Sequence, residues 1–289
     1  MKGGKDVTES FYKTRGFKIT AVTAAILAAV LMIPVILRAG IEIVGATYTV
    51  WTPDYEMIDL LPILEKEELS DEDYDTVFEQ TGLTRIAVDD YLSRGLKGEI
   101  LRIQRYFFEE PDYYCHIFHF CVGMIEKSEG RYPNALLQDG DIIYSPSTYI
   151  SFVNISHAAI VVDGEIGLLA EAYGYGSVIK TCTAASFFTY PQFVILRPKA
   201  DAALREEVAD FVREELLGTP YDIFTGIFGE KAPVPLETTH CSHMPWYAYY
   251  RHGIDLDSNG GKIVTPYDIL KSPYLEVVQV FGMDINDFR

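Results

Sequence analysis

Hydrophobic positions recur three or four residues apart between residues 47 and 135, which is the spacing of one face of a helix. Ser70 precedes a run of acids and is placed to cap a helix in which Tyr74 and Phe78 fall on one side. Apolar residues continue at helical spacing from 86 to 107. The pattern therefore predicts a helical region over 47–135 whose apolar faces build a core.

The pattern changes between residues 139 and 198, where short apolar runs are separated by glycine, proline and aspartate, as strands usually are. The runs are DGDIIYS, ISHAAIVVDG, IGLLAEAYG and FVILRP. An amphipathic helix is expected at 201–218, a second one from about Cys241 to Gly253, and a closing strand at 274–281. Helices, strands, helices and a final strand, in that order, predict the α+β class rather than alternating parallel units.

An uncharged run fills residues 19–37 and is long enough to cross the hydrocarbon layer of a membrane as a helix. The segment before it is basic, so it is expected to stay in the cytoplasm. We therefore predict a basic cytoplasmic tail (1–18), a transmembrane anchor (19–38) and an extracytoplasmic remainder, in a single-pass protein of the cell membrane. A cleaved signal peptide, with small residues at 44–46, and a buried core helix are the alternatives.

Charge and cysteine content narrow the class of protein further. The chain carries a net charge of −18, which argues against nucleic acid as a partner, because phosphate binding needs clustered lysine and arginine. Its four cysteines, at 115, 121, 182 and 241, are too few for a disulfide framework. Cys115 and Cys121 either pair with each other or are small buried side chains. The sequence does not indicate an oligomeric state.

Cys241 lies in the stretch HCSHMPWYAYY, at the expected beginning of a helix. The unpaired backbone N–H groups and the dipole of a helix N-terminus favour the thiolate, which is the nucleophilic form of cysteine. His240 and His243 flank the cysteine and are metal-ligand types. The chain has no matching C-x-x-C pair, however, so a zinc site is the weaker interpretation. We expect no metal and no cofactor.

A histidine that can serve this thiol stands at the head of the strand-like run HAAIVVD, at position 157. Together with GEIGLLAEAY this run predicts a hairpin. If the turn is centred on Gly164, His157 lies directly opposite Glu171, at a distance of about 5 Å between Cβ atoms. A carboxylate there would orient the imidazole and stabilise its charged form. A one-residue slip in register would undo the pairing. Cys241, His157 and Glu171 are thus the candidate triad.

Five ordered segments resemble the circularly permuted branch of the NlpC-type, papain-like cysteine hydrolases, the YiiX/YebB-like group. They are DGDIIYS (139–145), SHAAIVVDG (156–164), LAEAYGYGSVI (169–179), GTPYDIFT (218–225) and HCSHMPWYAYYRHGIDL (240–256). TPYDILKSP (265–273) is similar to the closing segment of that family. In this branch the histidine strand precedes the cysteine helix. The resemblance covers 137–283 and implies a permuted papain-like domain over 136–289, with an antiparallel sheet and packed helices.

The resemblance also implies roles for single residues. Cys241 matches the nucleophile, His157 the general base and acid, and Glu171 the polar residue that orients the histidine. Tyr221 in PYD matches a tyrosine that often lies near the site, and we expect its hydroxyl to hold the oxyanion together with the backbone N–H of Cys241. His243 stands where the family often has an acid, so the tuning of the thiol is expected to differ here.

The apolar N-terminal helix and the candidate triad together predict a membrane-anchored, extracytoplasmic cysteine hydrolase. It would be a peptidase or amidase acting on cell-wall peptides, or a hydrolase of lipid-linked acyl groups. Its partners would be a peptide, amide or acyl substrate and the membrane, bound through the N-terminal helix. The alternative is a papain-like binding module at the membrane surface without catalysis. Thiol reactivity separates the two, because only the enzyme needs an activated Cys241.

Overall fold

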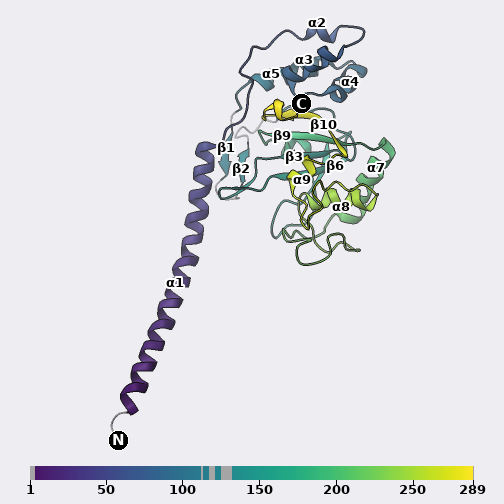
Figure 1. Cartoon of the computed structure of the whole chain (residues 1–289). Coiled ribbons are helices and arrows are strands. Elements are labelled where there is room, and N and C mark those ends of the chain that lie inside the picture. Colours follow the sequence, from purple (N-terminus) through teal and green to yellow (C-terminus); the bar gives the residue numbers. More distant parts are fainter. Residues whose placement is uncertain (1–3, 112, 117–120, 125–131, 289) are drawn as a thin grey trace.

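In the computed structural model of the chain, a long helix projects from the body of the molecule (Figure 1). The structure describes the backbone of residues 4–111, 113–116, 121–124 and 132–288. The helix, α1 (Gly4–Thr47), is continuous through Pro34. Its segment Val22–Thr47 is long and apolar enough to cross a membrane. Only 11% of the most apolar stretch of this segment is buried. α1 therefore extends beyond the predicted anchor at 19–38, and its exposure is unlike that of a core helix.

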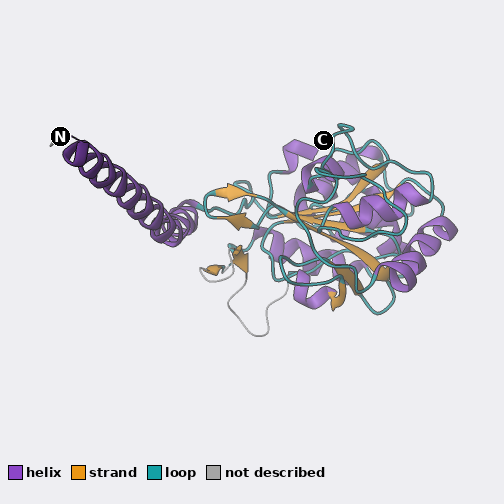
Figure 2. Ribbon diagram, turned by 90° about the horizontal axis from the view of Figure 1, so that it is seen from below, coloured by secondary structure: helices purple, strands orange, loops and turns teal. Residues whose placement is uncertain are grey.

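The body of the molecule is built on an antiparallel sheet with helices around it (Figure 2). Among the described residues, six strands follow the order β10-β9-β3-β6-β7-β8, and every neighbouring pair is antiparallel. The strands are β3 (Ile142–Ser145), β6 (His157–Asp163), β7 (Leu168–Glu171), β8 (Lys180–Thr183), β9 (Phe193–Pro198) and β10 (Leu275–Phe281). The α+β class and the antiparallel sheet are thus confirmed. β8 was not predicted, because its sequence KTCT has no apolar run.

Helices of the N-terminal region pack on one edge of this sheet. They are α2 (Leu61–Leu64), α3 (Asp71–Thr81), α4 (Arg85–Ser93) and α5 (Lys97–Phe108). Ser70 caps α3 through a capping box with Asp73, as the sequence predicts. Gly82 ends α3 with a positive φ, and a Cβ there would lie 2.0 Å from the carbonyl oxygen of Val280 in β10. The glycine therefore allows the helices to join the edge strand and share its hydrophobic core.

Two short strands lie within the region that the pattern predicts as helical. β1 (Tyr114–His116) and β2 (Cys121–Met124) pair in antiparallel fashion. In this register Cys115 is opposite Val122, and Cys121 is opposite His116. The side chains of both cysteines lie outside the described part of the structure, so the two alternatives for this pair stay open.

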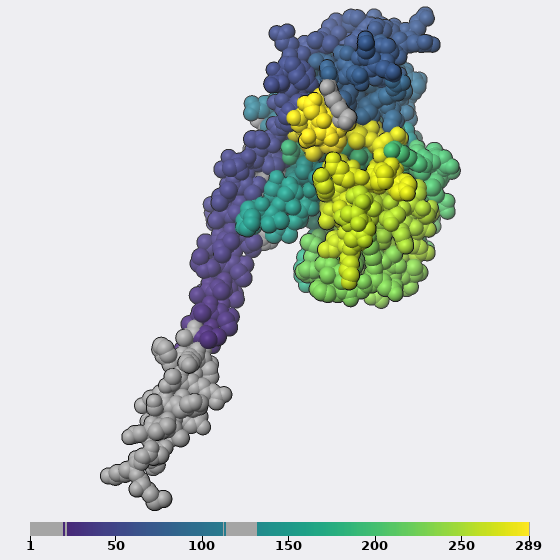
Figure 3. Space-filling view, in the orientation of Figure 1, coloured from purple at the N-terminus to yellow at the C-terminus, as the bar shows by residue number. Residues whose placement is uncertain are grey.

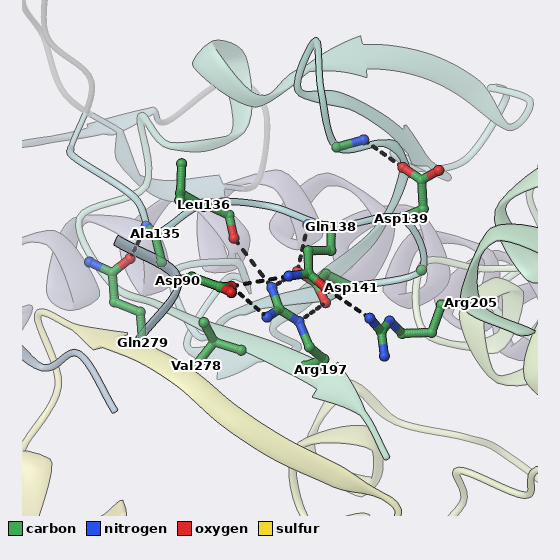
Figure 4. A network of polar contacts seen from close by, with 12 residues as sticks. Asp90, Ala135, Leu136, Gln138, Asp139, Asp141, Arg197, Arg205, Val278 and Gln279 are labelled. Atoms are coloured by element: carbon green, nitrogen blue, oxygen red, sulfur yellow. Dashed lines mark hydrogen bonds and ion pairs between the residues drawn. The ribbon is translucent and has the colours of Figure 1, made fainter. Parts of the chain in front are cut away.

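A buried ion cluster ties the helical region to the sheet (Figure 4). The guanidinium of Arg197 in β9 binds both carboxylate oxygens of Asp141, at 2.9 and 2.8 Å, and reaches Asp90 of α4 at 3.0 Å. A further N–H of Arg197 donates to the carbonyl of Leu136. Arg197 and Asp141 are both buried. Burial opposes the charge on Arg197, but the bonds to the two carboxylates outweigh it and raise the pKa of Arg197.

The remaining elements pack around the rest of the sheet, and α7 lies against its inner strand β6. They are α6 (Ala184–Phe187), α7 (Ala202–Phe211), α8 (His243–Arg251), α9 (Pro266–Leu270), a 3-10 turn (Ile285–Phe288) and a hairpin of β4 (Tyr149–Ile150) and β5 (Val153–Asn154). Asp201 caps α7 by accepting the N–H of Leu204. A π-helical turn continues α7 over Val212–Leu216. α7 with this turn lies within the amphipathic segment predicted at 201–218.

Candidate active site

Cys241 lies on the chain immediately before α8. The preceding residues pair with another segment, because Tyr221 and Thr239 form an isolated parallel bridge. The following residue, Ser242, donates its hydroxyl to the carbonyl of Val264 at 2.8 Å. The N–H of Met244 donates to the carbonyl of His240 at 3.0 Å, which turns the chain into the helix. The thiol is therefore held from both sides, close to the predicted helix beginning, and Cys241 is 9% exposed.

His157 and Glu171 meet as the sequence predicts, but not in the predicted register. His157 Nε2 lies 3.1 Å from Glu171 Oε2, and both side chains are largely buried. The prediction that the two residues are directly opposite is wrong. Ile160 pairs with Ala170, so Glu171 is opposite Ala159 and diagonal to His157 on the same face. The diagonal distance is still within reach of these longer side chains.

The turn between β6 and β7 explains the shift in register. The carboxylate of Asp163 accepts the N–H groups of Glu165 and Ile166, and Gly167 has a positive φ. The pairing slips between Val161 and Asp163. The turn is therefore longer and less symmetric than a turn centred on Gly164. It moves the pairs Ile160–Ala170 and Val161–Leu169 by two positions relative to the prediction, and the pair Asp163–Leu168 by three. Because the shift is even on the side of the slip that holds His157 and Glu171, these two side chains keep their face of the sheet.

The thiol of Cys241 and the imidazole of His157 interact closely enough that each shifts the pKa of the other. Nε2 of His157 faces Glu171, so Nδ1 is the nitrogen left for Cys241. Burial opposes ionisation of Cys241, but the hydrogen bond from His157, helped by His240, outweighs it and lowers the pKa of Cys241 to about 5. Burial likewise opposes the charge on His157, but its bonds with Cys241 and Glu171 raise the pKa of His157 to about 10. The pKa of Cys241 is thus lower than that of His157, as it is in a thiolate–imidazolium pair.

Aromatic rings hold the imidazole of His157 in place. The ring of Phe187 in α6 stacks on it, with centroids 5.6 Å apart and planes 18° from parallel. Tyr173 and Tyr190 approach it at 6.2 and 6.3 Å. These contacts restrict rotation of the imidazole and surround the pair with apolar atoms.

Cys182 is a second thiol of this cluster that the sequence did not reveal. It stands on β8 opposite Leu169 and contacts the carboxylate of Glu171. Burial, and then the charge of Glu171, raise the pKa of Cys182 to about 12. Cys182 therefore keeps its proton and donates to Glu171, while Cys241 loses its own. Burial would raise the pKa of Glu171, but the bond to His157 outweighs it and lowers that pKa.

His240 presents a buried nitrogen to the same site. Its Nδ1 accepts the N–H of His243 at 3.3 Å, so the proton of the neutral ring is on Nε2. Nε2 is buried and makes no geometrically sound hydrogen bond with any group in the described part of the structure. The ring is nevertheless close enough to Cys241 to lower the pKa of that thiol. His240 therefore stabilises the Cys241 thiolate, and its buried Nε2–H has no other acceptor in the described part of the structure. No sequence pattern could reveal it, since its burial and tautomer come from packing.

His243 has a structural place rather than a place beside the thiol. It is fully buried, its Nε2 donates to the carbonyl of Lys231 at 2.7 Å, and its Nδ1 accepts from the hydroxyl of Thr239 at 2.9 Å. Burial, and then His240, lower the pKa of His243 to about 3, so the ring is neutral. It therefore ties α8 to the loop before it.

The structure places Tyr221 on the segment beside Thr239, two positions before Cys241. Its backbone N–H donates to the carbonyl of Ser177 at 2.9 Å, and its ring packs against the core. Among the described residues, no group of three His, Cys, Asp or Glu side chains is arranged to hold a metal ion. Of the four predicted site residues, Glu171 bonds His157, and His157 and Cys241 shift each other's pKa, whereas Tyr221 lies on the segment beside Thr239.

We compared the chain with protein families, curated proteins and solved structures. No family model, no curated protein and no solved structure matches the chain.

Proposed function

We propose that this protein is a membrane-anchored cysteine hydrolase that cleaves an amide or ester of a carboxylic acid. The observation that carries the proposal is the chain of contacts Cys241–His157–Glu171, in which the thiol has the lower pKa and the imidazole the higher. A buried cysteine that serves only as an apolar filler has no need of such a partner, and burial alone would raise its pKa.

The proposed reaction begins with the Cys241 thiolate. Its sulfur attacks the carbonyl carbon of the substrate, and the carbonyl oxygen takes up the negative charge. His157 gives its proton to the leaving nitrogen or oxygen, the bond to the leaving group breaks, and a thioester with Cys241 remains. Water then attacks the thioester and passes a proton to His157, while the thiolate departs. The carboxylic acid product carries the oxygen from water.

Further groups support this sequence of steps. Glu171 accepts from Nε2 of His157 and stabilises the imidazolium, and Cys182 donates to Glu171 from the opposite side. We assign to His240 Nε2–H the role of a donor to the oxyanion, because it is buried, unsatisfied and beside Cys241. Tyr221 stays a second candidate for that role.

The resemblance to the permuted NlpC-type hydrolases agrees with this proposal. The chain order is the one expected for that branch, since the histidine strand β6 comes before the cysteine helix α8. The basic segment 1–18, which includes the first turns of α1, favours an orientation in which residues 39–289 are outside the cytoplasm. Cell-wall peptides and lipid-linked acyl groups are then the substrate classes to test first.

A screen of substrates on the full chain in bilayer nanodiscs tests the proposal. We expect turnover of an amide or acyl ester, and a mass increase by one acyl group on the peptide that contains Cys241. Cys241→Ala should lower turnover by roughly 10³-fold or more. Cys182→Ser is the matched control, because it removes the other thiol of the cluster but keeps a donor to Glu171, and it should retain most of the activity. Equal turnover in Cys241→Ala and the wild type would favour the binding module instead.

A further inference from the structure

The hairpin β4–β5 is packed directly on α1. The hydroxyl of Ser151, at the hairpin tip, donates to the carbonyl of Ile36 at 3.5 Å. Gly40 lies one turn further along, and a Cβ at that position would be 1.9 Å from the hydroxyl oxygen of Ser151. A side chain at position 40 would displace the Ser151 hydroxyl and would lie 3.1 Å from the backbone nitrogen of Phe152. Tyr149 of the hairpin also joins a small apolar cluster with Ile41. The sequence therefore provides specific contacts between the hairpin and α1, through Ser151 and Tyr149.

The hairpin tip is apolar and exposed, although it touches the helix. Ile150 is 38% exposed, Phe152 66% and Val153 51%. Ile33 and Ile36 on the neighbouring part of α1 are about half exposed as well. Figure 3 shows the teal hairpin region against the purple helix. Helix and hairpin thus present one continuous apolar surface, which water would not favour.

A second apolar tip lies elsewhere on the body. The loop 222–238 carries Phe224 at 56% exposure, Phe228 at 87% and Val234 at 70%. In Figures 1 and 3 this loop lies at the bottom of the body, on the side towards which α1 runs. Its ends are joined by the bridge between Tyr221 and Thr239. The loop therefore projects from the segment that leads into Cys241.

We propose that the hairpin tip (Ile150, Phe152, Val153) and the loop tip (Phe224, Phe228, Val234) insert into the surface of the lipid bilayer that α1 crosses. The inference rests on the anchoring of α1 in a membrane. Ser151 contacts α1 at Ile36, within the apolar segment Val22–Thr47, and a helix that spans a membrane is surrounded by lipid at that depth. Lipid is thus the occupant that reaches the hairpin without any further partner.

The arrangement has a consequence for the candidate site. His157 begins β6 three residues after the hairpin ends, and Cys241 follows the loop by three residues. Each member of the pair is therefore joined by a short stretch of chain to one of the two proposed lipid contacts. A substrate amide or ester would be met at the bilayer surface rather than in bulk water.

Tryptophan scanning in vesicles tests the inference. The full chain, as Phe152→Trp or Phe228→Trp, is reconstituted into phosphatidylcholine vesicles with brominated acyl chains, which quench nearby indoles. The signal of the native Trp51 and Trp246 is subtracted with the wild type. We expect each added tryptophan to lose about half or more of its fluorescence, because interfacial side chains reach the boundary of the acyl chains.

Two further variants make the result decisive. Ile166→Trp replaces an apolar side chain that is 70% exposed in the turn after the far end of β6, and it should not be quenched. Leu31→Trp lies on α1 and should be quenched strongly. If Leu31→Trp is not quenched, the anchor itself is wrong. If Leu31→Trp is quenched but Phe152→Trp or Phe228→Trp behaves like Ile166→Trp, the anchor stands and the two-tip contact is overturned. Turnover by Cys241 is measured separately and decides neither outcome.

Discussion

The molecule contains two buried polar clusters, one around Arg197 and one around Cys241. They differ in the kind of contact that holds them together. Around Arg197, every contact pairs a permanent cation with a carboxylate or a carbonyl, and two bonds reach Asp141 side by side. Around Cys241, neutral groups exchange a proton, and one donor of His240 has no partner in the described structure. The first cluster pairs opposite charges directly and needs no proton transfer to complete its contacts. The second cluster forms its charged pair only when a proton passes from Cys241 to His157.

The difference indicates which buried polar cluster stabilises the fold and which is suited to a reaction. Arg197 joins β9 to Asp90 of α4 and so fixes the helical region on the sheet. A guanidinium cannot give up its proton in a protein, so Arg197 has no acid–base function. Cys241 and His157 have pKa values of about 5 and about 10, on either side of neutrality and opposite to their usual order. The predictions below are ways to test this contrast.

The largest effect is expected from Arg197→Leu. Removing the guanidinium leaves the buried carboxylate of Asp141 without compensation, which should lower the free energy of unfolding by about 3–5 kcal/mol. Urea unfolding, followed by tryptophan fluorescence, measures it. Arg102→Leu is the matched control, because its ion pair with Glu99 is half exposed and should be worth about 1 kcal/mol or less. A loss in Arg197→Leu no larger than in the control would contradict the structural role.

A smaller effect, on catalysis, is expected from Glu171→Gln. The amide can still hold the ring of His157, but it cannot stabilise the positive charge. Turnover should fall about 100-fold, equivalent to about 2.7 kcal/mol. The alkaline limb of the pH profile should also move down from about 10, because the pKa of His157 loses one of the causes that raise it. Glu165→Gln, an exposed acid in the turn of the same hairpin, should change neither quantity. An unchanged alkaline limb would argue against the proposed role of Glu171.

The smallest effect is expected from His240→Ala. Loss of the Nε2–H donor should reduce turnover about tenfold and move the acid limb of the pH profile upward, since His240 helps to lower the pKa of Cys241. His240→Gln should keep much of the activity, because its amide can both accept from His243 and donate. His252→Ala, at the other end of α8, is the control. If His240→Ala lowers only the stability and leaves the pH profile in place, the donor role is wrong.

Much of the fold could be predicted from local patterns. Ser70 with the acids after it specifies the beginning of α3, and Asp201 that of α7, because caps depend on neighbouring residues alone. β3, β6 and β9 are continuous apolar runs because both faces of the sheet are covered. The short hairpin β4–β5 and the strand β8 lack such runs, and they form because neighbouring strands or α1 hold them in place.

The site could be predicted in part for the same reason. The contact between His157 and Glu171 survives a wrong register, because an even shift keeps both side chains on one face. The turn made by Asp163 fixes the true register, and its length is not readable from the glycine alone. The roles of Cys182 and His240 were not predicted, because they depend on which groups packing brings beside them. Cys182 lies near Glu171 because β8 pairs with β7. The tautomer of His240 is set by the backbone N–H of His243 in α8.

The most direct test of the account is the rate of alkylation of single cysteines by iodoacetamide as a function of pH, resolved by peptide mass spectrometry on the full chain. The thiolate fraction of Cys241 should rise through an apparent pKa of about 5, so its reaction should already be on a plateau at pH 6–7, where Cys182, with a pKa of about 12, stays unmodified. In His157→Asn the midpoint for Cys241 should move upward by several pH units. A midpoint for wild-type Cys241 near the ordinary value of about 8.5, unchanged in His157→Asn, would contradict the thiolate–imidazolium pair.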